Sequence, residues 1–177
     1  MPARGKRLVI DSDITSSASE SDVEPAKSCR ELLEAVLHST HRVVMTEAGS
    51  REWREHRSGF SKRWRSAMES RRRLDYVAGD LRPDLETGIT RLFVDEREHA
   101  AVIKDLHLVA GALATDRIIF SRDDVARTSM RHAARTIREL ARIHWTNPTN
   151  PAEGAVDWVK AGAPAERARQ LGFKAVP

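Results

Sequence analysis

The sequence has a single cysteine, Cys29, and no apolar run that approaches the length of a membrane-spanning helix. One thiol cannot form a disulfide within the chain, and this is typical of a cytoplasmic protein. The N-terminus is basic and then apolar, but its apolar segment 8–10 is too short for the core of a signal peptide. These absences predict a cytoplasmic protein without a membrane partner.

Several motifs of enzyme chemistry are also absent. The segment "VAGAL" (109–113) lacks the glycine spacing of a dinucleotide or P-loop fingerprint, and there is no Gly-x-Ser-x-Gly elbow. The pairs His38 with His41 and His99 with His107 have no cysteine partners at zinc-motif spacing. The sequence therefore gives no support to a nucleotide-binding loop, a serine or thiol nucleophile, or a zinc site.

Positive charge is concentrated in one block. The net charge is +4, yet segment 51–73 alone holds nine Lys and Arg against three Glu. A local excess of this kind indicates a polyanionic partner such as nucleic acid, although a solvated helical face is the alternative. Trp53 and Trp64 interleave the block, and their helical spacing favours core positions over base stacking. The candidate nucleic-acid-binding residues are Arg54, Arg57, Lys62, Arg63, Arg65, Arg71, Arg72 and Arg73.

Short apolar segments alternate with helical patterns along the chain. Strands are expected at 7–11, 41–46, 117–121 and 141–146, and helices at 25–38, 47–75 with a break at Gly59, 95–114 and 123–140. Segment 14–24 is expected to be a loop, and 77–95 contains turn signals without a clear element. This alternation predicts a three-layer α/β/α fold with a central, mostly parallel sheet of four to five strands. We expect one domain over 1–146, with 147–177 as a helical extension packed on it.

Carboxylates follow two of these strands. Asp11 ends the first strand, Asp123 comes just after the third, and Asp105 lies early on the helix before the third strand. Ligands bind beyond the carboxyl ends of parallel strands, so these acids are expected at one edge of the sheet. A single Asp at a strand end is commonly a helix cap, but a gathered set would repel unless a hard cation neutralised it. The pattern therefore predicts a Mg²⁺ or Mn²⁺ site suited to phosphodiester hydrolysis.

Two segments resemble the PIN-domain family of metal-dependent nucleases. "VIDSDI" (9–14) is similar to the family's opening strand and acid, and "DLHLVAGALATDRIIFSRDD" (105–124) to its second half. The resemblance implies four catalytic acids, of which three are also metal ligands: Asp11, Asp105 and Asp123. The second catalytic acid would be Glu52, with Glu47 as the alternative; Glu52 could equally pair with a nearby arginine. The auxiliary positions are Asp13, Ser121 and Asp124, of which Asp124 also suits a helix N-terminus.

The function implied by the resemblance is a Mg²⁺- or Mn²⁺-dependent endoribonuclease. Within the family, the toxin of a toxin–antitoxin pair is one role, with RNA as substrate and an antitoxin as a protein partner. Two alternatives remain open at this stage. One is a non-catalytic PIN-like protein that binds nucleic acid or a partner, and the other is a receiver-type signalling domain, which also gathers acids around Mg²⁺.

Overall fold

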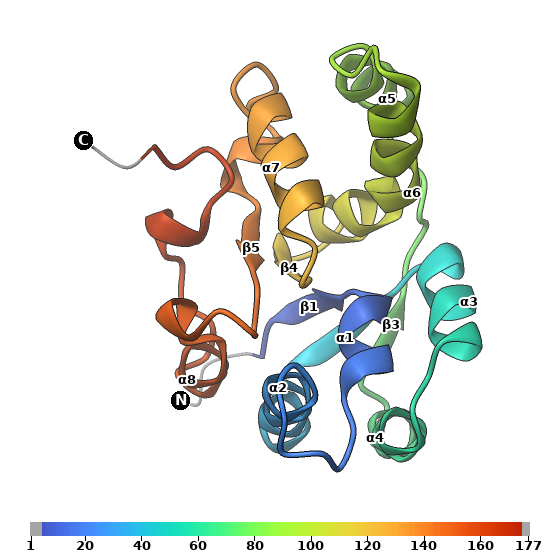
Figure 1. Ribbon diagram of the computed structural model, residues 1–177, viewed down its shortest axis with the longest axis vertical. Helices are drawn as coiled ribbons and strands as arrows, with labels where there is room; N and C mark the ends of the chain where they lie inside the picture. The colour runs from blue at the N-terminus through green and yellow to red at the C-terminus, as the bar shows by residue number, and fades with distance from the viewer. Residues whose placement is uncertain (1–4, 175–177) are drawn as a thin grey trace.

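The computed structural model describes residues 5–174, which form one parallel sheet covered by helices on both faces (Figure 1). The sheet has five strands in the order β3-β2-β1-β4-β5, and every neighbouring pair is parallel. The strands are β1 (Arg7–Ile10), β2 (Arg42–Met45), β3 (Leu74–Tyr76), β4 (Ile118–Phe120) and β5 (His144–Thr146). The predicted three-layer α/β/α architecture is confirmed.

Eight α-helices and three short 3₁₀ helices connect and follow the strands within residues 5–174. The α-helices are α1 (Ser12–Ser17), α2 (Ala26–His38), α3 (Glu47–Glu55), α4 (Gly59–Ser70), α5 (Pro83–Thr90), α6 (Glu96–Leu113), α7 (Asp124–Ala133) and α8 (Ala155–Lys160). The 3₁₀ helices are η1 (Leu140–Arg142), η2 (Pro151–Glu153) and η3 (Arg167–Arg169). In the part of the chain that the structure describes, no helix combines the length and the apolar character needed to cross a membrane.

The alternation of side chains along β1 divides the core into two layers. Leu8 and Ile10 face a cluster built with residues of α1, α2, α3, α4 and α8, whereas Val9 faces a cluster built with α5, α6 and α7. All three side chains are almost fully buried. Burial of each one stabilises the fold by roughly 2 kcal/mol. The alternation therefore fixes which face of β1 packs against which group of helices.

Helix α6 lies very close to the sheet. A Cβ on Gly111 would stand 3.3 Å from Val9 Cγ2 and 3.4 Å from Val44 Cγ1, so only glycine fits there without displacement. The helix begins at Asp95, whose carboxylate accepts hydrogen bonds from the backbone N–H groups of Arg97 (2.9 Å) and Glu98 (3.1 Å). The helix expected over 95–114 is confirmed, and its residue Gly111 packs directly against β1 and β2.

Two elements differ from the sequence-based expectations. Segment 14–24 was expected to be a loop, but its first residues belong to α1, where Ser17 Oγ donates to the Asp13 carbonyl (2.7 Å) and Ile14 is fully buried. Strand β3 was not predicted, because its three residues carry little apolar pattern. It is held instead by the bidentate pair of Arg42 on β2 with Asp75 (2.9 Å from Nε to each oxygen).

The ends of other elements are shorter than expected. Helix α7 stops at Ala133 rather than near residue 140, and strand β5 starts at His144 after the η1 turn. The expected break at Gly59 is confirmed, since α4 begins there with the Ser58 hydroxyl accepting from Ser61 N (3.0 Å). After β5 the chain forms α8, which lies beside α2 and adds to the same core layer.

Candidate functional site

The predicted acids follow strands at the point where the sheet topology changes direction. Strand β1 lies between β2 and β4, and the chain leaves β1 toward β2 and later returns through β4 on the other side. The crevice between the carboxyl ends of two such strands is the usual ligand site of parallel sheets. Asp11 follows β1 directly, its backbone N–H donates to the Phe120 carbonyl (2.9 Å), and Asp123 follows β4.

Ser121 joins the two strand ends. Its side chain is fully buried, and its hydroxyl donates to Asp11 Oδ2 at 2.7 Å. The hydroxyl oxygen of Ser121 also accepts a hydrogen bond from the Asp123 backbone N–H at 3.0 Å. Asp123 in turn caps α7, since its Oδ1 accepts from Ala126 N at 2.8 Å. One hydroxyl therefore fixes the carboxylate after β1 relative to the loop after β4.

Helix α3 brings Glu52 to Asp11. The indole N–H of Trp53 donates to the Ile10 carbonyl (3.1 Å), which anchors α3 at the end of β1. Ser12 Oγ donates to Glu52 Oε2 (3.0 Å) and lies 3.4 Å from Asp11 Oδ1. Glu47, the alternative second acid, is exposed in the first turn of α3 and makes no hydrogen bond or ion pair with any residue of 5–174. The structure thus places Glu52, not Glu47, beside Asp11.

Asp105 is buried on α6 without compensation. It is 8% exposed, and no donor within residues 5–174 hydrogen-bonds to its carboxylate. Burial and, to a smaller extent, the carboxylates of Asp11, Asp123 and Glu52 raise the pKa of Asp105 to about 7, against an opposing effect of Lys104. Such repulsion requires proximity, so these four acids share one electrostatic environment.

Asp13 is a second carboxylate with an unbalanced charge. Burial and the neighbouring Asp11 together raise the pKa of Asp13 to about 7, although Arg122 opposes the shift. The Arg122 backbone N–H donates to Oδ2 at 2.8 Å, whereas Oδ1 is buried and has no partner among the described residues. An ionised carboxylate buried in this way is unfavourable unless a cation neutralises it.

These side chains suit a hard divalent cation in their chemistry. Within residues 5–174, no three His, Cys, Asp or Glu side chains form a ready-made metal-binding group in this conformation. However, the atoms that would bind a metal are all carboxylate oxygens. Asp105 accepts no hydrogen bond from residues 5–174, and Asp13 Oδ1 is unpaired. Oxygen ligands with excess negative charge are what Mg²⁺ and Mn²⁺ prefer, so the residues present fit such an ion.

Asp124 lies outside this group of acids. It is exposed at the start of α7, forms an ion pair with Arg127 and accepts from Asn147 Nδ2 (3.1 Å). Asp105 and Asp123 instead line a narrow cavity of about 40 Å³ on the other side of α7. The geometry therefore gives Asp124 the helix-terminal role considered from the sequence.

His107 contacts the site, although the sequence did not single it out as functional. It is 8% exposed, its Nδ1 lies 3.1 Å from Thr46 Oγ1, and its Nε2 lies 3.7 Å from Glu52 Oε2. Thr46 Oγ1 also accepts from Gly49 N (3.0 Å), so Thr46 links the first turn of α3 to His107. Helical periodicity could not identify this residue, because the whole of 105–112 is buried.

The basic block separates into two groups in the structure. Arg54, Arg57, Lys62 and Arg72 are exposed and form no ion pair with any described residue. The other four are engaged within the fold: Arg63 pairs with Glu20, Arg65 pairs with Glu69, and Arg71 and Arg73 donate to carbonyls at the end of α2. Trp53 and Trp64 are buried core residues, as their spacing favoured.

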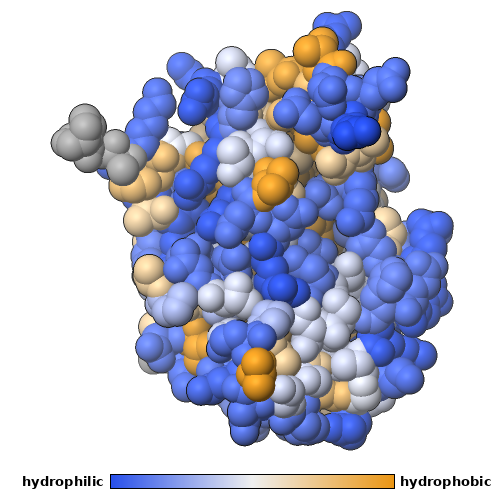
Figure 2. All heavy atoms as spheres, viewed as in Figure 1, coloured by the Kyte–Doolittle hydropathy of each residue, from blue (hydrophilic) through white to orange (hydrophobic). Residues whose placement is uncertain are grey.

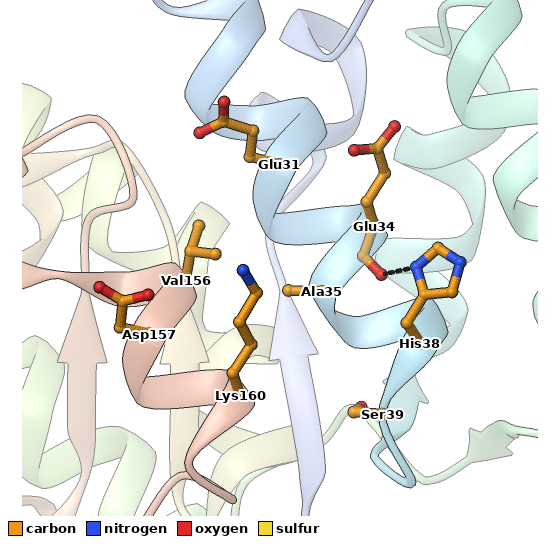
Figure 3. Close-up of a pocket in the computed structure, with 8 residues that line it drawn as sticks. All are labelled: Glu31, Glu34, Ala35, His38, Ser39, Val156, Asp157 and Lys160. Carbon is orange, nitrogen blue, oxygen red and sulfur yellow. Dashed lines mark hydrogen bonds between the residues drawn. The ribbon is translucent and has the colours of Figure 1, made fainter.

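Cavity size alone does not locate this site. A roomier cavity of about 660 Å³ lies between α2 and α8, where Lys160 and Val156 face α2 (Figure 3). Its acids, Glu31, Glu34 and Asp157, are spread over two helices and do not include the strand-end group. On the face in Figure 2, hydrophilic residues cover most of the surface, and apolar atoms gather mainly at the top near α5.

Comparison of the chain with protein-family models, with curated proteins and with solved structures gave no match.

Proposed function

We propose that the protein is a Mg²⁺- or Mn²⁺-dependent endonuclease that acts on RNA. The observation that carries the proposal is Asp105, a buried carboxylate that accepts no hydrogen bond from residues 5–174 and lines one cavity with Asp123, which follows β4. A fold that only needed stability would gain by replacing such a charge with an uncharged residue. The choice of RNA rests on the PIN resemblance of 9–14 and 105–124, and within that family a toxin role with an antitoxin partner remains part of the proposal.

Each acid has a distinct role in this proposal. Asp11, Asp105 and Asp123 would hold the cation, with Glu52 as the fourth carboxylate and Asp13 as support. A bound Mg²⁺ or Mn²⁺ would supply a more acidic water molecule and charge neutralisation at the phosphodiester. Ser121 keeps Asp11 oriented through its hydrogen bond (2.7 Å), and Ser12 holds Glu52 (3.0 Å).

The substrate strand would cross the outer face of α3. Arg54 lies on the same helix as Glu52, and Arg57 and Lys62 follow it toward α4. All three are exposed and are not engaged in ion pairs within 5–174. Exposed cations of this kind bind phosphate groups without recognising bases. They therefore contribute to the affinity for the strand and to its position, and not to sequence specificity.

The receiver-type alternative fits the geometry less well. Receiver domains share the flavodoxin-like strand order 2-1-3-4-5, whereas this sheet has the order β3-β2-β1-β4-β5. Strand β3, which would end at a phosphoacceptor Asp, ends at Tyr76. We therefore retain phosphodiester hydrolysis as the proposed reaction.

A cleavage assay with single-stranded RNA tests the proposal. Wild-type protein should cleave in Mg²⁺ or Mn²⁺ and stop in EDTA, and Asp11→Asn and Asp105→Asn should each lower the rate by on the order of 100-fold or more. Asp157→Asn, which changes an exposed acid on α8, should cleave like wild type. Undiminished cleavage by purified Asp11→Asn protein, or cleavage that persists in EDTA, would contradict the proposal.

A further inference from the structure

A second polar cavity lies on the other side of α7 from the acidic group. It has a volume of about 390 Å³ and is lined by residues of α7, η2 and the C-terminal segment around η3. The residues that matter for its chemistry are Arg127, Arg131, Trp145, Glu153, Glu166 and Arg169. None of them belongs to the strand-end acids.

Trp145 differs from the other tryptophans in its hydrogen bonding. All four tryptophans are at least 97% buried. Three of them donate the indole N–H to a backbone carbonyl at 2.6 to 3.1 Å: Trp53, Trp64 and Trp158. Trp145 lines the cavity, and its buried indole N–H has no acceptor within residues 5–174. A buried tryptophan N–H usually finds a partner, so an acceptor is missing here.

Arg169 adds a second donor without a partner. Its Nε donates to Glu166 Oε2 (2.6 Å), and its guanidinium lies 4.5 Å from the Trp158 ring centroid. Its Nη1 is buried and has no acceptor among the described residues. Leaving one such donor unsatisfied costs roughly 1 to 3 kcal/mol, so two at one cavity indicate a ligand that accepts hydrogen bonds.

The charge of the cavity selects an anion. Three arginines line it with the two carboxylates Glu153 and Glu166, and Asp124 pairs with one of these arginines from outside the lining. Arg127 is already neutralised by Asp124 and Glu153. Arg131 is exposed on α7 and forms no ion pair with a described residue. An oxyanion with several acceptor oxygens could therefore be shared by Arg131, Arg169 and Trp145.

We propose that this cavity binds a phosphate group. Phosphate offers enough oxygens for the two unpaired donors and for Arg131 together, and Arg favours it through multiple N–H groups. Glu166, whose side chain is 42% exposed, can turn away so that the phosphate takes its place beside Arg169. The site does not depend on the proposed hydrolytic function, since it shares no residue with the acidic group.

Titration with inorganic phosphate at constant ionic strength tests the site. The Trp145 indole resonance in a ¹H–¹⁵N spectrum should shift downfield on binding, while the Trp64 resonance stays in place. By calorimetry, Trp145→Phe and Arg131→Gln should each weaken binding by about tenfold or more, and Trp64→Phe should not. Arg131 is on the surface, so its replacement leaves folding intact. An unmoved Trp145 resonance, or equal affinity in the Arg131→Gln protein, would overturn the proposal.

A further arm of the experiment identifies the source of the phosphate. Adenosine 5′-monophosphate and a 5′-phosphorylated RNA pentamer are titrated into the Asp11→Asn protein, which prevents cleavage from confusing the result. Binding of the pentamer at least about tenfold tighter than the mononucleotide indicates a strand phosphate. Equal binding indicates a small phosphate ligand. Failure of both to displace inorganic phosphate would refute a phosphate ester at this site, whatever the outcome of the RNA cleavage assay.

Discussion

Replacing Asp105 by Asn should stabilise the metal-free protein. Asp105 is 8% exposed, lacks a hydrogen-bond donor among residues 5–174 and is repelled by Asp11, Asp123 and Glu52. Its ionised form is therefore more unfavourable in the folded than in the unfolded chain. Asn removes the charge with almost no change in shape, so the variant should unfold at a higher denaturant concentration than wild type.

The size of this effect follows from the pKa of Asp105, which burial raises from 3.8 to about 7. A shift of this size corresponds to about 4 kcal/mol near pH 8, where the carboxyl group is ionised in both states. Asn must still bury its own amide, so a gain of about 2 to 4 kcal/mol is expected. Because the folded-state pKa is raised, the penalty in wild type begins above the unfolded pKa and grows until about pH 7. The amide cost is the same at every pH, so the gain should fall to about 0 to 2 kcal/mol near pH 5.5 and be lost by about pH 4.

Urea denaturation of the two proteins in EDTA, at several pH values between about 4 and 8, measures this difference. Asp157→Asn, an exposed acid on α8, provides the control and should show no pH-dependent gain. Addition of Mg²⁺ should raise the stability of wild type by mass action and leave Asp105→Asn nearly unchanged. The reasoning is wrong if Asp105→Asn is less stable than wild type near pH 8, or if its advantage does not shrink on acidification.

Four further predictions concern other parts of the fold. Arg73→Gln should lower the free energy of unfolding by about 1 to 3 kcal/mol, because Arg73 donates to carbonyls at the end of α2. Arg54→Gln should change the free energy of unfolding by less than about 0.5 kcal/mol but lower the slope of log affinity for RNA against log salt concentration by about one. Equal slopes for wild type and the variant would exclude a phosphate contact of Arg54. Gly111→Leu should destabilise by about 1 to 3 kcal/mol in thermal unfolding, because its side chain would meet Val9 and Val44. Burial lowers the pKa of His144, so stability should be lost as the pH falls below about 6.5, and His144→Gln should reduce this loss in acid titrations.

The sequence predicted the elements whose apolar residues alternate or repeat. Strands β1 and β4 are short apolar runs, and the acids that follow them meet because parallel strands end at one edge. Asp105 could be expected near them because small residues follow it on α6, and Gly111 does allow the close approach. Helix α1 and strand β3 were missed because hydroxyl hydrogen bonds and the Arg42–Asp75 pair hold them, and hydrophobic patterns do not record such contacts.

A count of charges could not show which residues of the basic block are exposed and which are bound within the fold. Arg54 and Arg73 are indistinguishable in a count, yet one is exposed on α3 and the other is bound to the carbonyls at the end of α2. The difference arises because the carbonyls that bind Arg73 lie 32 to 37 positions before it in the chain and come close to it only in the folded structure. The same reason hid His107, whose partners Thr46 and Glu52 belong to other elements.

Helix α7 separates two places where polar groups are out of balance with opposite signs. On one side, the buried Asp105 carboxylate accepts no hydrogen bond from residues 5–174, and Asp13 Oδ1 has no partner among them. On the other side, Trp145 and Arg169 are donors that lack acceptors. Native folds leave few buried polar groups unpaired, so two such defects of opposite sign indicate two ligands of opposite charge. If both ligands were parts of one substrate, an RNA strand bound to a cation, Arg131→Gln would weaken strand binding while Asp157→Asn would not. If they are independent, wild type and Arg131→Gln should bind the RNA strand with equal affinity.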